Sequence, residues 1–99
     1  MHVISMKRLR EFWAIHPKSE RPLRAWFQIA DRNEWNSLDE IRRTLPATDG
    51  VGKCLVFNVS GNHFRLIAYA NYRTHKLYVL KVMTHAEYSR GRWKEECRC

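Results

Sequence analysis

Three side chains in the C-terminal half of the chain carry groups suited to proton transfer and anion binding: Arg65, His85 and Tyr88. A histidine imidazole titrates at about pH 6.5, so His85 can both accept and donate a proton near neutrality. Tyr88 follows three residues later, a spacing that brings two side chains to the same side of a helical turn. Arg65 presents a planar, permanently charged fork that can hold a phosphate with two parallel hydrogen bonds.

Each of these residues also has a purely structural alternative. A histidine at the start of a helix can be held by backbone hydrogen bonds, a tyrosine can cover a sheet edge, and a strand arginine can simply be solvated. Arg65 favours a functional interpretation, because strand alternation places it on the same face as Lys81. For His85 and Tyr88 both interpretations stay open.

The segment that must position these groups, residues 51–86, contains no Asp and no Glu, but five Lys or Arg and three His. Its hydrophobic pattern predicts three strands at about 53–58, 63–71 and 76–83, with turns at 60–62 and 72–75. A sheet that carries only positive or titratable charge is suited to bind a phosphodiester backbone. Alternation directs Arg65 and Lys81 away from the helices, so both are expected to be open to solvent and ligand.

The third predicted strand has its own two faces. Alternation groups Tyr78, Leu80 and Val82 on one face, and Leu77, Val79 and Lys81 on the other. The apolar members of these sets are expected to meet the N-terminal helices.

Charge is distributed unevenly along the 99 residues, whose net charge is +8. Residues 1–50 hold nine basic and seven acidic side chains, whereas residues 51–99 hold nine basic and only three acidic ones. This asymmetry favours a nucleic-acid or acidic-protein partner for the C-terminal half; the alternative is a small basic domain that is merely soluble.

The length predicts a single domain spanning residues 1–99. Without a secretory h-region or membrane span, a reducing bacterial-type cytoplasm is the expected location.

The sequence pattern of the N-terminal half predicts mostly helices. Residues 2–5 predict a short edge strand, and apolar periodicity predicts helices at about 6–16, 19–32 and 38–45, capped by Ser5, Ser19 and Ser37. Their periodic aromatic residues are typical of helices that pack on a sheet rather than of a ligand platform. Residues 47–53 read as a loop. A capping box from Thr84 to Glu87 predicts a short helix or turn carrying His85 and Tyr88.

The cysteines do not suggest a disulfide framework, because their number is odd and two of the three stand almost adjacent: Cys54, Cys97 and Cys99. Cys54 lies in an apolar run and is expected to be a core thiol. Cys97 and Cys99 lack partners at zinc-ligand spacing, and the sequence leaves their role open. His63 and His75, beside turns, are interpreted as ordinary surface histidines. We therefore expect no metal and no cofactor.

These residue types match the needs of metal-free RNA cleavage. In that reaction the ribose 2′-oxygen attacks the adjacent phosphate, which requires a base, a proton donor and cations to stabilise the phosphorane. His85, Tyr88 and Arg65 supply these functions, while Lys53, Arg73, Lys81 and Lys94 are expected to bind the RNA backbone.

The chain resembles the HigB toxins of HigBA toxin–antitoxin systems, within the wider RelE/ParE-like group. The resemblance covers almost the whole chain and depends on motifs in this order: MHVIS, LREFWAIHP, PLRAWF, VFNVSGNHFRLIAY, LYVLKVMTH and THAEYSRGRWK. This chain has Ser60 where the family often has glycine, Ser89 where it often has aspartate, and an unusual CRC ending.

The resemblance implies more than the residues alone. It implies an α+β fold, with N-terminal helices on one face of a small twisted antiparallel sheet. It implies an mRNA interferase that acts without metal on transcripts in the ribosomal A site of the small subunit. The implied partner is a HigA antitoxin, a helix-turn-helix protein through which the complex binds operator DNA. On the matching motifs, Arg65 would bind phosphate, and His85 and Tyr88 would be active-site residues with Lys94 nearby.

A different class of function remains open at this point, since a fold does not determine a function. The alternatives are a ParE-like contact inhibitor of a topoisomerase and a non-catalytic RNA-binding regulator. DNA damage without transcript cleavage would indicate the first, and RNA binding without cleavage the second.

Overall fold

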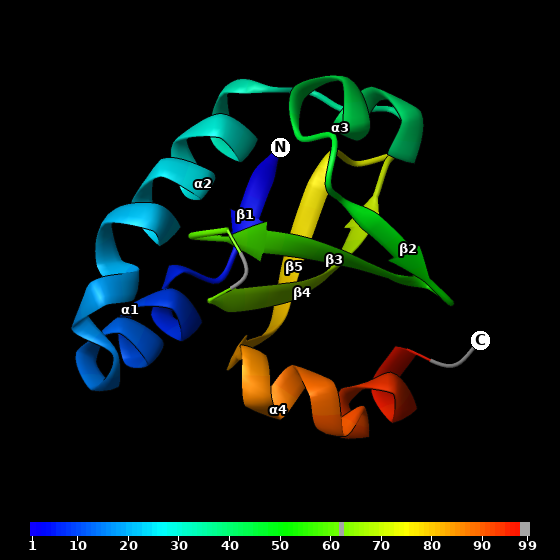
Figure 1. Ribbon diagram of the computed structural model, residues 1–99. Helices are drawn as coiled ribbons and strands as arrows, with labels where there is room; N and C mark the ends of the chain where they lie inside the picture. The colour runs from blue at the N-terminus through cyan, green and yellow to red at the C-terminus, as the bar shows by residue number, and fades with distance from the viewer. Residues whose placement is uncertain (62, 98–99) are drawn as a thin grey trace.

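The computed structural model describes residues 1–61 and 63–97, with only the backbone for Glu96. The strands are β1 (His2–Ile4), β2 (Asp49–Val51), β3 (Cys54–Val59), β4 (Phe64–Asn71) and β5 (Lys76–Thr84). The helices are α1 (Met6–Ile15), α2 (Glu20–Arg32), α3 (Leu38–Thr44) and α4 (His85–Arg90), with 3-10 turns η1 (Pro17–Ser19) and η2 (Arg92–Cys97). The predicted α+β class is confirmed (Figure 1).

The five strands form one sheet in the order β1-β5-β4-β3-β2. The pairs from β2 to β5 are antiparallel, as expected, but β1 lies parallel to β5, with Val3 opposite Leu77. The sheet is therefore mixed. The segment predicted as a loop at 47–53 contains β2, because its residues pair with the start of β3, Val51 opposite Cys54.

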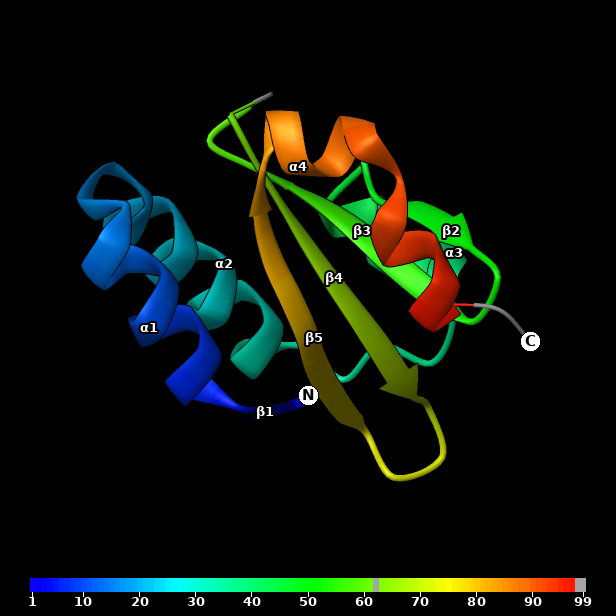
Figure 2. The same ribbon diagram turned by 90° about the horizontal axis from the view of Figure 1, so that it is seen from below.

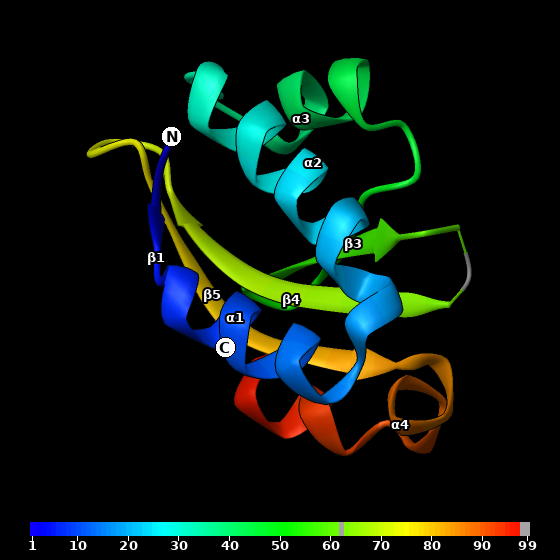
Figure 3. The ribbon, with the colours of Figure 1, turned by 90° about the vertical axis from the view of Figure 1, so that its left-hand side faces the viewer.

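The N-terminal helices cover one face of the sheet and build the larger core (Figure 3). On α2 the buried side chains are Leu23, Trp26 and Ala30, a spacing of three and four residues that lines one helix face. Trp26 meets Phe57 of β3 edge-on, with ring centroids 5.3 Å apart. The interpretation of the helical aromatic residues as core is confirmed.

The predicted caps are partly right. Ser5 and Ser37 accept hydrogen bonds from first-turn amides as N-caps. Ser19 does not cap through its side chain, because it already has helical backbone angles and its hydroxyl donates to the His16 carbonyl. The chain therefore enters α2 through η1, which Pro17 begins.

The opposite face of the sheet is covered in part by α4 and η2, which return across β3 and β4 (Figure 2). They enclose a second, smaller core: Cys54, Val56, Ile67, Met83, Trp93 and Cys97. Trp93 is only 2% exposed. A second covered face was not predicted, because the tail reads as polar apart from Trp93.

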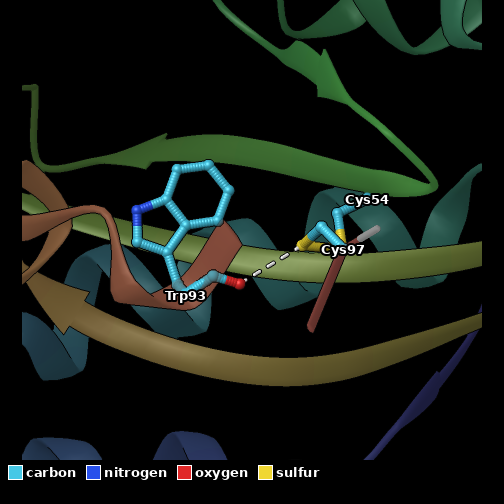
Figure 4. The surroundings of a disulfide bond; sticks show 3 residues. All are labelled: Cys54, Trp93 and Cys97. Carbon is cyan, nitrogen blue, oxygen red and sulfur yellow. Dashed lines mark hydrogen bonds between the residues drawn. A yellow bond between two sulfur atoms is a disulfide. The ribbon is translucent and has the colours of Figure 1, made fainter. Parts of the chain in front are cut away.

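Cys54 and Cys97 form a disulfide across this second core, so the prediction of a free core thiol at Cys54 is wrong (Figure 4). The bond joins the start of β3 to the end of η2, positions 43 residues apart. The backbone amide of Lys53 also donates to the Cys97 carbonyl, at 3.1 Å. Both interactions hold the C-terminal segment against the sheet. Cys99 lies outside the described residues.

A bulge changes the faces of β5. Ile67 pairs with Lys81 but the next residue, Ala68, pairs with Val79, so Leu80 is extra. Leu77, Val79 and Val82 consequently all contact the helix-side core, whereas Leu80 packs on the second core. The simple alternation predicted for this strand is therefore wrong beyond the bulge.

Within the described part of the chain, no helix is long and apolar enough to cross a membrane.

Candidate active site at the β4–β5–α4 corner

The elements that carry the predicted catalytic residues join where β4 begins and β5 ends. Phe64 pairs with Thr84 at this corner, and α4 starts at the next residue, His85. Thr84 accepts from the amide of Glu87, while the Glu87 carboxylate accepts from the Thr84 amide, which is the predicted capping box. This cap fixes the start of the turn, and His85 and Tyr88 both extend from it.

Arg65 lies one residue into β4, and its side chain is buried, at 8% exposed. The prediction that it is open to solvent is therefore wrong. Its Nη1 donates to the carbonyl oxygens of Gly61, at 3.3 Å, and Phe64, at 3.1 Å. Its Cζ lies 5.1 Å from the ring centroid of Tyr88. A guanidinium in these contacts supports the β3–β4 hairpin and places a permanent positive charge beside Tyr88.

Tyr88 is half-buried and packed against a second partner. Its ring stacks on the Trp93 indole, with centroids 5.0 Å apart and planes 13° from parallel. Trp93 Nε1 in turn donates to the Tyr88 carbonyl, at 2.9 Å. A guanidinium and an indole thus both lie against the Tyr88 ring. Stacking on an RNA base is accordingly a poor role for this ring, which leaves the phenol hydroxyl as the group we expect to act.

His85 and His63 are exposed and lie on adjacent backbones. The amide of His85 donates to the carbonyl of His63, at 3.1 Å. His63 is therefore at the site, although the sequence was interpreted as giving it an ordinary surface position. His75 lies elsewhere, in the β4–β5 turn, where its Nε2 is 2.9 Å from Asn36 Oδ1.

The side chains predicted to bind the RNA backbone lie at different distances from the β4–β5–α4 corner. Lys81 is half-buried on β5 opposite Ile67, two positions from the Arg65–Met83 pair. Lys94 is exposed, with Nζ 5.9 Å from the Trp93 ring centroid. Lys53 is exposed beside the same C-terminal segment.

Arg73, by contrast, is not at the site. It lies in the turn that follows β4. The eight residues of β4 separate it from the corner by roughly 27 Å, at about 3.4 Å per residue.

An exposed aromatic pair on the sheet was missed by the sequence analysis. Tyr69 and Tyr78 are cross-strand partners, and their rings stack with centroids 6.2 Å apart. Tyr69 is 38% exposed. The alternation of side chains along β4 could have identified Tyr69, because it places this residue on the same face as Arg65.

The donor set at the corner is cationic and titratable. The Glu87 carboxylate accepts from the amide and hydroxyl of Thr84 in the helix cap. Among the described residues, no group of three His, Cys, Asp or Glu side chains is placed to hold a metal ion. The corner therefore offers imidazole, phenol and guanidinium groups for proton transfer and phosphate binding.

Comparison with known proteins places the chain in a family. The model of the HigB toxin family, described as a RelE-like toxic component of a toxin-antitoxin system, matches residues 19–91. The mRNA interferase HigB of Escherichia coli O6:H1 is 28% identical over 93 residues, which cover 91% of this chain and 90% of the relative. The mRNA interferase toxin HigB of Escherichia coli K12 is 30% identical over 91 residues, covering 89% and 88% respectively. Because the family match spans most of the chain, this protein belongs to the HigB toxin family, the RelE-like toxic components of toxin-antitoxin systems.

Proposed function

We propose that the protein is an mRNA interferase toxin that cleaves translated transcripts at the β4–β5–α4 corner. The observation that carries this proposal is the grouping of Arg65, Tyr88 and His85 in one corner of a basic sheet. Two relatives that match this chain over almost its whole length are named mRNA interferase, which supports the same activity here.

The proposed reaction is attack of the ribose 2′-oxygen on the adjacent phosphorus. The new O2′–P bond forms as the P–O5′ bond breaks, giving a 2′,3′-cyclic phosphate and a 5′-hydroxyl. A proton leaves the 2′-oxygen and another reaches the 5′-oxygen, so the site must take one and give one. We assign proton transfer to His85 and hydrogen bonding of the phosphate to the Tyr88 hydroxyl.

Arg65 has an electrostatic role in this proposal. Negative charge grows on the non-bridging phosphate oxygens in the transition state, and a fixed positive charge nearby stabilises it. Because Arg65 is buried, its charge is poorly screened by solvent and acts over a longer range than that of a surface lysine. It also holds Tyr88 in place, so loss of Arg65 removes two contributions together.

The RNA is proposed to follow the face that carries Arg65. Lys81 lies along this face from the corner, and Tyr69 and Tyr78 offer an exposed aromatic pair further along it. Lysines bind the phosphates without reading sequence, and aromatic rings stack on any base. Lys94 and Lys53 extend the positive surface on the side of η2.

Membership of a family of toxins from toxin-antitoxin systems supports an antitoxin as one partner. We propose that the substrate is mRNA held in the ribosomal A site, where a reading frame is presented in single-stranded form. We further propose neutralisation by a HigA-type helix-turn-helix antitoxin, through which the complex would contact operator DNA.

The test is the chemistry of the cleaved ends. Reporter mRNA on programmed ribosomes is incubated with the purified protein, and the products are analysed for terminal groups. The proposal predicts 2′,3′-cyclic phosphate and 5′-hydroxyl ends. Products with 5′-phosphate and 3′-hydroxyl ends, which arise when an activated water is the nucleophile, would overturn attack by the 2′-oxygen.

A further inference from the structure

The backbone of His85 is hydrogen-bonded across the corner to that of His63. The β4–β5 ladder ends with Phe64 opposite Thr84, and the next residue on each side is a histidine. The hydrogen bond from the His85 amide to the His63 carbonyl, at 3.1 Å, continues the pairing by one step. This backbone hydrogen bond holds the two histidines side by side, so both imidazoles extend from the same corner.

Both imidazoles are accessible to a ligand. His63 and His85 are exposed, whereas Arg65 and Tyr88 beside them are packed. His63 lies in the turn before β4, two positions ahead of Arg65. The corner therefore presents two imidazole rings at the surface, next to the strand that carries the buried Arg65.

We propose that His63 is a second catalytic residue, which exchanges protons with the substrate together with His85. This inference depends on the proposed RNA cleavage. One neutral imidazole accepts the proton of the 2′-hydroxyl as the O2′–P bond forms. The other, protonated, gives its proton to the 5′-oxygen as the P–O5′ bond breaks. The two histidines end with their protonation states exchanged, and solvent restores them.

The charged and titratable groups of the described chain around the pair include Arg65, His16 and Glu87. Arg65 follows His63 by two residues, and the ring centroid of His16 lies 6.2 Å from that of Phe64, the residue next to His63. The Glu87 carboxylate on α4 accepts from the amide and hydroxyl of Thr84. The reaction requires one imidazole that accepts a proton and one that donates a proton, and the two exposed histidines can supply both.

The first test is the pH profile of single-turnover cleavage on programmed ribosomes. Wild-type protein should show a bell-shaped profile, with one rising and one falling limb. His63→Gln should lower the maximal rate by about 10²-fold or more and remove one limb, with RNA binding unchanged. His2→Gln is the matched control, because His2 is also exposed but lies on β1, at the other end of β5.

A second test separates the acid from the base. Replacing the 5′-bridging oxygen with sulfur gives a leaving group that needs no proton. Of the variants His63→Gln and His85→Gln, one should recover to within about tenfold of wild type on this substrate, and the other should not. That pattern requires both histidines to act on the reacting atoms.

The outcomes distinguish this inference from the proposed function. If wild type cleaves and His85→Gln does not, but His63→Gln keeps the wild-type rate and both limbs, His63 is not catalytic and the nuclease assignment stands. If wild type fails to cleave at all, the proposed function itself fails, and this inference fails with it. Thermal unfolding of each variant checks that the fold is retained.

Discussion

The guanidinium of Arg65 lies 5.1 Å from the ring centre of Tyr88, and this contact joins the sheet to the short helix that carries the proposed active site. On its own, α4 has six residues, too few for a stable isolated helix. The Trp93 indole packs on the same ring, so Tyr88 is held by contacts from the sheet and from η2. The position of the Tyr88 hydroxyl is therefore set by both.

Substitutions of Tyr88 should separate its hydroxyl from its ring. Tyr88→Phe keeps both ring contacts and removes the proposed phosphate ligand, so cleavage should fall by about 10- to 100-fold while the unfolding temperature changes little. Tyr88→Leu also loses the stacking, which should add roughly 1–2 kcal/mol of destabilisation. Single-turnover rates and urea unfolding measure the two effects. Equal cleavage rates for Tyr88→Phe and wild type would show that the Tyr88 hydroxyl has no role in cleavage.

The Cys54–Cys97 disulfide should make stability dependent on redox conditions. The bond closes a loop between positions 43 residues apart, a length for which roughly 2–4 kcal/mol of stabilisation is typical. Reductant should therefore lower the urea midpoint of the wild-type protein. A Cys54→Ala, Cys97→Ala double variant is the control and should not respond. A wild-type midpoint that is insensitive to reductant would contradict the role given to this bond.

Gly52 should not tolerate a side chain. Its φ is +55°, and a Cβ at this position would lie 2.1 Å from the Cys97 carbonyl oxygen. Gly52→Ala should therefore strain the turn and push η2 from the sheet, at a cost of about 1–3 kcal/mol. Gly61→Ala is a useful comparison, because it has a similar φ of +63° but open space around the Cβ. Urea unfolding should rank Gly52→Ala as the less stable of the two.

Tyr69 should contribute to RNA binding rather than to the chemical step. Base–aromatic stacking contributes about 1–3 kcal/mol per base, so Tyr69→Ala should raise KM by roughly 5- to 100-fold with little change in kcat. Tyr69→Phe keeps the ring and serves as the matched control. A fall in kcat with unchanged KM would instead connect this residue to catalysis.

Tyr72 should make the fold sensitive to alkaline pH. Burial raises the pKa of Tyr72 above its ordinary value, so the unfolded chain releases this proton at lower pH than the folded one. The free energy of unfolding should therefore fall as the pH rises from the ordinary tyrosine pKa toward the raised one. Tyr72→Phe should flatten this part of the profile, measured by urea unfolding across the alkaline range. An identical slope in both proteins would count against the effect.

Local pattern predicted most elements because those elements depend on local physics. The spacing of Leu23, Trp26 and Ala30 is sufficient to predict α2, and the Thr84–Glu87 capping box predicts α4. The turn at 72–75 was also predicted and is present.

The errors concern contacts between distant segments. Neither the parallel pairing of β1 with β5 nor the disulfide between Cys54 and Cys97 follows from any local pattern. The burial of Arg65 has the same origin, since it depends on Tyr88 returning over the sheet. The position of His63 beside His85 is likewise set by strand register, which places two residues of unrelated local sequence on adjacent backbones.

Primer-extension mapping of one reporter mRNA, with purified protein and with or without programmed ribosomes, decides whether the protein is a ribosome-dependent nuclease. We expect cuts in the coding frame that need ribosomes and that disappear with His85→Ala in a folded protein. Cuts on naked RNA would support the nuclease activity but contradict its dependence on ribosomes. No cuts in either condition, from a protein that still arrests growth, would contradict the proposed function and favour a contact inhibitor instead.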